Sequence, residues 1–118
     1  LSDGNVEGYM SAECKHYRDR VKDGGFVRTG TESVGRIFHI GRVSNLDPDP
    51  IVVSLAYSDT QDGEPVRVDT VEVGPEEDFF FNPEDYEFDI AAGGYAELYA
   101  SAPHGGEVTL SITTTKKA

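Results

Sequence analysis

The last third of the chain alternates between apolar and polar side chains with a period of two residues. From 108 to 114, Val, Leu and Ile alternate with Thr and Ser, and from 95 to 102, Ala and Leu alternate with Tyr, Glu and Ser. This period is typical of a β-strand with one buried face and one exposed face. Pro103-His104-Gly105-Gly106 between the two segments predicts a tight turn. The pattern therefore indicates an antiparallel β protein.

Further strands are expected upstream, separated by segments rich in Gly, Pro and Asp. Strand spacing of this kind predicts an all-β fold, an antiparallel, jelly-roll-like β-sandwich of about seven or eight strands. We assign residues 34–118 to this domain. The predicted strands are 26–29, 36–43, 51–57, 66–73, 79–81 and 86–90. The predicted core consists of Ile37, Val53, Leu55, Val68, Leu98, Val108, Leu110 and Ile112.

Residues 1–33 are less regular and are expected to form an N-terminal arm that docks onto a partner. Two conformations remain open for it. A short helix over 10–21 is one, because Met10, Cys14, Tyr17 and Val21 share a helical face; an extended arm with a strand at 9–13 is the other. Asp23-Gly24-Gly25 would end any helix.

Charge is unevenly distributed along the chain. The net charge is −12, yet residues 1–42 carry seven Lys and Arg against six acids, whereas residues 43–115 carry 16 acids and the single basic residue Arg67. An acidic surface favours solubility and disfavours direct binding of nucleic acid, which depends on neutralising phosphates. The basic N-terminal segment could instead contact a partner, with Tyr17, Arg18 and Arg20 as candidate interface residues.

Phe79, Phe80 and Phe81 follow one another in a predicted strand. Successive side chains of a strand point to opposite faces, so at least one Phe must leave the core. Either a neighbouring segment covers it, or the three Phe mark a subunit interface, where aromatic residues are enriched.

No catalytic constellation is recognisable, so we expect neither an enzyme nor a cofactor. His16, His39 and His104 lack ligand spacing, and His39 is expected to be half-buried in a strand. The lone Cys14 is expected to be a partly buried thiol. Acidic turns at 47–49 and 59–64 lack the spacing of a calcium loop, so no metal site is expected. No apolar run approaches the ~20 residues that cross a membrane.

From residue 37 to residue 114, about two-thirds of the chain, the order of features resembles small β-sandwich structural proteins of tailed bacteriophages, namely head decoration, head-fibre and neck or tail accessory proteins. The matching segments are 40–45, 51–57, 66–75, 90–102 (Ile-Ala-Ala-Gly-Gly-Tyr-Ala-Glu-Leu-Tyr-Ala-Ser-Ala) and 107–114.

The resemblance implies a virion structural protein on the capsid surface that binds the major capsid protein or another virion protein. It also implies self-association, with a homotrimer as the first choice. The alternative is a carbohydrate- or matrix-binding β-sandwich module of a secreted protein. The chain has no Trp, so Tyr95 and Tyr99, four residues apart on the same face of one strand, would be the platform for a sugar.

Overall fold

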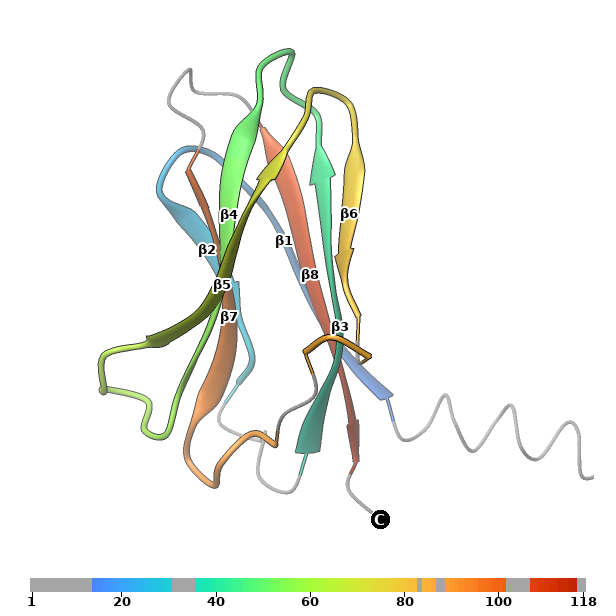
Figure 1. The fold of residues 1–118 in the computed structure, drawn as a ribbon. Coiled ribbons are helices and arrows are strands. Elements are labelled where there is room, and N and C mark those ends of the chain that lie inside the picture. Colours follow the sequence, from blue (N-terminus) through green and yellow to red (C-terminus); the bar gives the residue numbers. More distant parts are fainter. Residues whose placement is uncertain (1–13, 31–35, 83, 87–88, 102–106, 117–118) are drawn as a thin grey trace, which may run out of the picture.

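The computed structural model is a sandwich of two antiparallel β-sheets (Figure 1). It describes residues 14–30, 36–82, 84–86, 89–101 and 107–116. These residues contain strands and turns and no helix, which confirms the all-β prediction. The strands are β1 (Cys14–Val21), β2 (Gly25–Arg28), β3 (Arg36–Asn45), β4 (Ile51–Ser58), β5 (Val66–Val73), β6 (Asp78–Phe81), β7 (Tyr95–Ser101) and β8 (Val108–Lys116).

The strand order of the two sheets is that of a jelly roll. Sheet A has the order β1-β8-β3-β6 and sheet B the order β2-β7-β4-β5, and every neighbouring pair is antiparallel. Among successive strands only β4 and β5 share a sheet, so the chain repeatedly crosses from one layer to the other. Eight strands wound in this way into two sheets define the jelly roll. β7 and β8 lie in opposite sheets, so they do not form a hairpin, and the tight turn predicted at 103–106 lies outside the described residues.

The core lies between the sheets and is built from the inward positions of the alternating strands. Val108, Leu110 and Ile112 of sheet A are completely buried, as are Val53, Leu55 and Leu98 of sheet B. Each such side chain contributes roughly 1.5–3 kcal/mol through burial. Ile37 is partly buried, and Val68 is 40% exposed, so its assignment to the core was wrong.

Val68 lies outside the core because Val71 and Val73 face inward, which places Val68 on the outward phase of β5. The register of β5 against β4 also shifts at this point. Leu55 pairs with Asp69 and Ala56 pairs with Arg67, so Val68 has no partner in the ladder. A second irregularity of register lies between Phe38 and Ile40 of β3.

The N-terminal part of the described chain belongs to the sandwich. β1 pairs with β8 over its whole length, and β2 pairs with β7, so residues 14–28 do not form an arm separate from a domain that begins at residue 34. A helix over 10–21 is wrong for residues 14–21, while the alternative strand at 9–13 lies outside the described residues. The partner strand β8 decides the conformation, because it satisfies the backbone groups of β1.

The turn after β1 carries the chain from sheet A to sheet B. Gly24 has a φ of +75°, a left-handed conformation that favours glycine, and the amide of Gly25 donates to the carbonyl oxygen of Lys22 at 2.9 Å. The predicted strand 26–29 is confirmed as β2. The predicted strand 86–90 is not: of its described residues, Asp89 makes an isolated bridge to Ile37.

A buried asparagine fixes the turn between β3 and β4. The side-chain amide of Asn45 donates to the carbonyl oxygens of Asp49, Val73 and Gly74 at 2.9–3.1 Å. Its Oδ1 accepts from the amide of Asp47 at 2.8 Å. Asn45 is 1% exposed, so these bonds replace the hydrogen bonds to water that its side chain loses on burial. The turn is thereby tied to the end of β5, across the sandwich.

Candidate functional site

The outer face of sheet A gathers arginines from two strands that are distant in sequence. Arg18 of β1 and Arg42 of β3 both pair with Ser111 of β8, and Arg42 also pairs with Phe80 of β6. One row thus crosses all four strands, with Arg20 in the row beside it. We call the surface around Arg18, Arg20, Arg42 and Phe80 the arginine face.

The arginine face is open to solvent. Arg42 donates to Asp78 at 2.8 Å and Arg20 donates to Glu107 at 3.3 Å, and all four side chains are about half exposed. The Arg42 guanidinium also lies 5.5 Å from the centre of the Phe80 ring. A hollow of about 280 Å³ lies among the three arginines, with a floor of Ser44, Thr109 and Ser111. The hydrogen bond from Arg42, followed by one from Ser44, holds the pKa of Asp78 below its usual value.

The structure separates the six residues proposed for an interface into two groups. Arg18, Arg20 and Phe80 are exposed on the arginine face, and Phe80 is 46% exposed, which confirms that one Phe leaves the core. Phe81 is completely buried, whereas Phe79 and Tyr17 are partly buried against the core. Phe79 and Phe81 meet edge to face with ring centres 5.0 Å apart. Whether Phe80 and the arginines form an interface stays a prediction.

Sequence reasoning missed Arg42, which completes the arginine face. Arg42 lies in a predicted strand, but no sequence pattern showed that β3 would be separated from β1 by β8 alone. The available signal was the alternation of β3, in which Gly41 and Val43 face inward and Arg42 faces outward.

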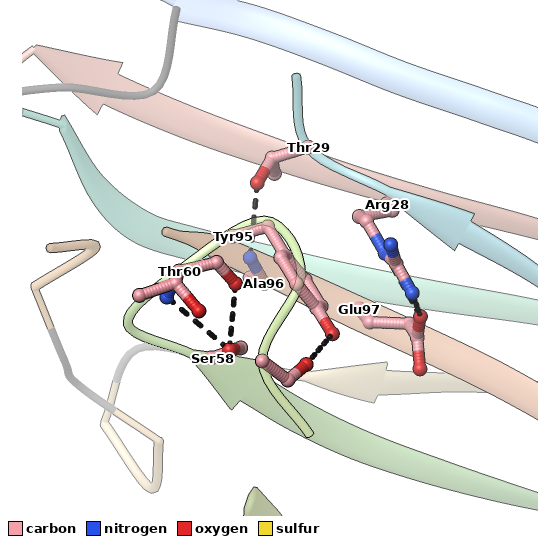
Figure 2. A network of polar contacts seen from close by, with 8 residues as sticks. Arg28, Thr29, Ser58, Thr60, Tyr95, Ala96 and Glu97 are labelled. Atoms are coloured by element: carbon pink, nitrogen blue, oxygen red, sulfur yellow. Dashed lines mark hydrogen bonds and ion pairs between the residues drawn. The ribbon is translucent and has the colours of Figure 1, made fainter. Parts of the chain in front are cut away.

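The outer face of sheet B carries a buried ion pair and a groove. Arg28 donates from Nε at 3.0 Å and from Nη2 at 2.6 Å to Oε1 of Glu97, whose side chain is only 7% exposed (Figure 2). The Arg28 guanidinium also stacks 3.9 Å from the centre of the Tyr95 ring. A groove of about 440 Å³ runs beside the pair, lined by Phe26, Ser54, Arg67 and Tyr99 among others.

The proposed platform of Tyr95 and Tyr99 does not exist. Tyr95 is 1% exposed, and Arg28 lies over its ring, so a ligand cannot reach it. Tyr99 is 39% exposed and pairs across strands with Phe26, which is 45% exposed. The exposed aromatic pair of sheet B is therefore Phe26 with Tyr99.

A tyrosine–carboxylate bond ties sheet B to the segment after β6. The Tyr86 hydroxyl donates to Oδ2 of Asp69, and this bond, together with partial burial, raises the pKa of Tyr86 to about 12. The same bond, followed by one from the Thr70 amide, lowers the pKa of Asp69. Tyr86 also packs edge to face on Phe81, with ring centres 5.2 Å apart.

Metal-ligating side chains are scattered in the part of the chain that the structure describes. There, no three His, Cys, Asp or Glu side chains are close enough to hold a metal ion. His39 is exposed, contrary to expectation, whereas His16 shares a hydrogen bond with Thr113 on the arginine face. Cys14 is partly buried, as expected. Within the described residues, no helix is long and apolar enough to cross a membrane.

Comparison with known proteins assigns the chain to no family. No protein-family model matches the chain, and no curated protein matches it. Among solved structures, the coat protein of Tobacco streak virus is similar, with a TM-score of 0.39 and 9% sequence identity, over 90% of this chain and 88% of that chain. Similarity at this level carries no information about function.

Proposed function

We propose that this chain is a structural protein of a virus particle and that it binds another virion protein through the arginine face. The observation that carries the proposal is the contrast between this face and the rest of the molecule. The chain has a net charge of −12, yet a solvent-exposed surface over one whole sheet presents Arg18, Arg20 and Arg42. A cationic surface on an acidic protein has the charge that a selective docking site requires.

The fold and the sequence resemblance support this proposal together. Jelly rolls serve as viral capsid domains and as lectin domains, so the fold alone leaves the function open. The segments that resemble phage structural proteins coincide with strands of the sandwich, for example 51–57 with β4 and 107–114 with β8.

The chemistry of the arginine face favours an acidic protein surface as the partner. Among the described residues Arg18 has no ion-pair partner. Arg20 and Arg42 can leave their exposed carboxylates for those of a partner at little cost in free energy. Phe80 adds an exposed aromatic ring, the kind of side chain that anchors protein interfaces. A nucleic acid fits less well, because its affinity rests on neutralising many phosphates, and the face offers three arginines, two of them already paired with carboxylates.

In this proposal the chain sits on the capsid surface as a decoration protein, or on the head–tail assembly as an accessory protein. Its partner is the major capsid protein. The chain itself assembles into a trimer, the closed assembly that matches the three-fold sites of a capsid lattice. The role is binding through shape and charge, without a catalytic step.

The test uses capsid particles assembled from the major capsid protein that the same genome encodes. We expect the chain to co-sediment with these particles, and Arg18→Glu to weaken its binding at least ~10-fold through charge reversal on the arginine face. Arg67→Glu is the matched control, because it makes the same change at an exposed position of sheet B and should leave binding intact.

Two outcomes would contradict the proposal. One is a chain that does not co-sediment with such particles, or that binds equally well after Arg18→Glu. The other comes from the neighbouring genes: genes for secreted hydrolases, in place of capsid, portal or tail genes, would favour the alternative of a secreted module.

A further inference from the structure

The groove on sheet B has its own polar chemistry, independent of the arginine face. Both contacts from Arg28 reach Oε1 of Glu97, and no described residue donates to Oε2. Figure 2 shows this second oxygen directed away from Arg28. Because Glu97 also lines the groove, a carboxylate oxygen on a side chain that is only 7% exposed remains available to a ligand. Among the described residues only Oδ2 of Asp47 is both buried and unpaired, so Oε2 of Glu97 keeps contact with solvent in the groove.

Donors and acceptors alternate along the groove. Arg28 and Arg67 flank Glu97, since Arg28 pairs with Glu97 across β2 and β7, while Glu97 and Arg67 both pair with Ala56 of β4. A cationic ligand would meet two guanidinium groups, and an acidic group placed at Oε2 of Glu97 would be repelled by the carboxylate. Hydroxyl groups satisfy both neighbours, because each hydroxyl can donate to a carboxylate and accept from a guanidinium.

Exposed aromatic rings flank this polar floor. Phe26 and Tyr99 are cross-strand partners on β2 and β7, each between a third and a half exposed, and both line the groove of about 440 Å³. The negative face of an aromatic ring attracts the polarised C–H groups of a flat ligand. The expected ligand therefore combines hydroxyl groups with an apolar face.

We propose that the groove between Phe26 and Arg67 binds a neutral oligosaccharide of pyranose sugars. One sugar ring lies against the ring of Tyr99, beside Phe26, whose own ring lies 4.9 Å from the Arg28 guanidinium. One hydroxyl of this sugar donates to Oε2 of Glu97, and a neighbouring hydroxyl accepts from Arg67. Ser54 of β4, which already shares a hydrogen bond with Thr70 at 3.1 Å, lies on the floor of the groove.

This site is separate from the one proposed for virion binding. Sheet A and sheet B form opposite layers of the sandwich (Figure 1), so the arginine face and the groove can be occupied at the same time. A chain that is docked through sheet A would still present the groove of sheet B to its surroundings. Failure of the sugar test would leave the proposed virion role unchanged.

The test begins with the whole chain on a glycan array and continues by titration calorimetry with cellohexaose, chitohexaose and maltohexaose. We expect saturable binding of at least one neutral glycan. Tyr99→Ala should weaken it about 10-fold, because the stacked ring is lost. Glu97→Gln should also weaken it about 10-fold, because a neutral acceptor replaces the charged one.

Phe80→Ala is the matched control, since it removes an equally exposed aromatic ring from the opposite face. It should leave glycan binding unchanged, and circular dichroism should show that all three variants are folded. The absence of binding to any neutral glycan would overturn the proposal. So would binding that survives Tyr99→Ala, or a groove that binds only a protein, such as a second copy of this chain.

Discussion

Each outer face of the sandwich carries an arginine–carboxylate pair, and the two pairs differ in their surroundings. Arg42 and Asp78 on sheet A are 51% and 45% exposed, with Phe80 the ring near the guanidinium. Arg28 and Glu97 on sheet B are 32% and 7% exposed, and the guanidinium stacks on Tyr95 as well as lying 4.9 Å from the centre of the Phe26 ring.

This difference shows how position in a sheet decides the role of one chemical pair. β6 is an edge strand, so the Arg42–Asp78 pair that joins it to β3 stays in contact with water. β7 lies between β2 and β4, so neighbours on both sides cover Glu97. The exposed pair is available for exchange with a partner, whereas the buried pair holds strands together and shapes a groove.

The largest expected effect comes from the core that supports both faces. Ile112→Asp places an unpaired charge at a completely buried position between the sheets and should cost at least ~5 kcal/mol, enough to unfold the protein. Thr113→Asp, one residue further on the outer face, is the control and should leave the domain folded. Far-ultraviolet circular dichroism reports both, and a folded Ile112→Asp protein would contradict the assigned register of β8.

The second prediction tests the two ion pairs directly. Arg28→Ala leaves the Glu97 carboxylate buried without its partner and should reduce the free energy of unfolding by about 2–3 kcal/mol. Arg42→Ala breaks an exposed pair and should cost less than about 1 kcal/mol. Urea unfolding curves measure both. Equal losses would show that burial does not distinguish the two faces.

Self-association should depend on the arginine face more than on the groove. Phe80→Ser removes an exposed ring and should weaken association at least ~10-fold, and salt should strengthen association of the parent by screening its negative charge. Sedimentation velocity at low and high salt gives both quantities. Tyr99→Ser is the control on sheet B. A parent that stays monomeric at high protein and salt concentration would contradict the prediction.

The smallest expected effect concerns the bond that joins sheet B to the segment after β6. Folding raises the pKa of Tyr86 from 10.0 to about 12 and lowers that of Asp69 below 3.8. The bond therefore contributes fully to stability between the two unfolded-state pKa values, 3.8 for Asp69 and 10.0 for Tyr86. It is lost as the pH falls through the Asp69 titration and as it rises from about 10 through 12.

Tyr86→Phe removes the hydroxyl and should be less stable than the parent near pH 7. The difference in unfolding free energy between the two proteins should shrink near pH 3 and again near pH 12. Urea unfolding at the three pH values measures this difference. A difference that is constant with pH would show that Tyr86 acts only through its contact with Phe81.

The sequence determined most of the strands and the faces that they bury, although it did not predict β1 and wrongly placed a strand at 86–90. Strict alternation in β8 and β7 put Leu110, Ile112 and Leu98 in the core, since the pleat of a strand sends successive side chains to opposite sides. The same argument required one of three consecutive Phe to be exposed. The β-sandwich class followed from the number and spacing of the strands, because short amphipathic strands bury their apolar faces in two layers.

Only the tertiary structure decided which strands are neighbours. β1 lies beside β8, and β2 beside β7, so residues that are dozens of positions apart share a face, as Arg18 and Arg42 do. Local pattern cannot report such pairings, because they arise from long-range hydrogen bonding along strand edges. For the same reason the sequence treated residues 14–28 as an arm, and chose Tyr95 rather than Phe26 as the companion of Tyr99.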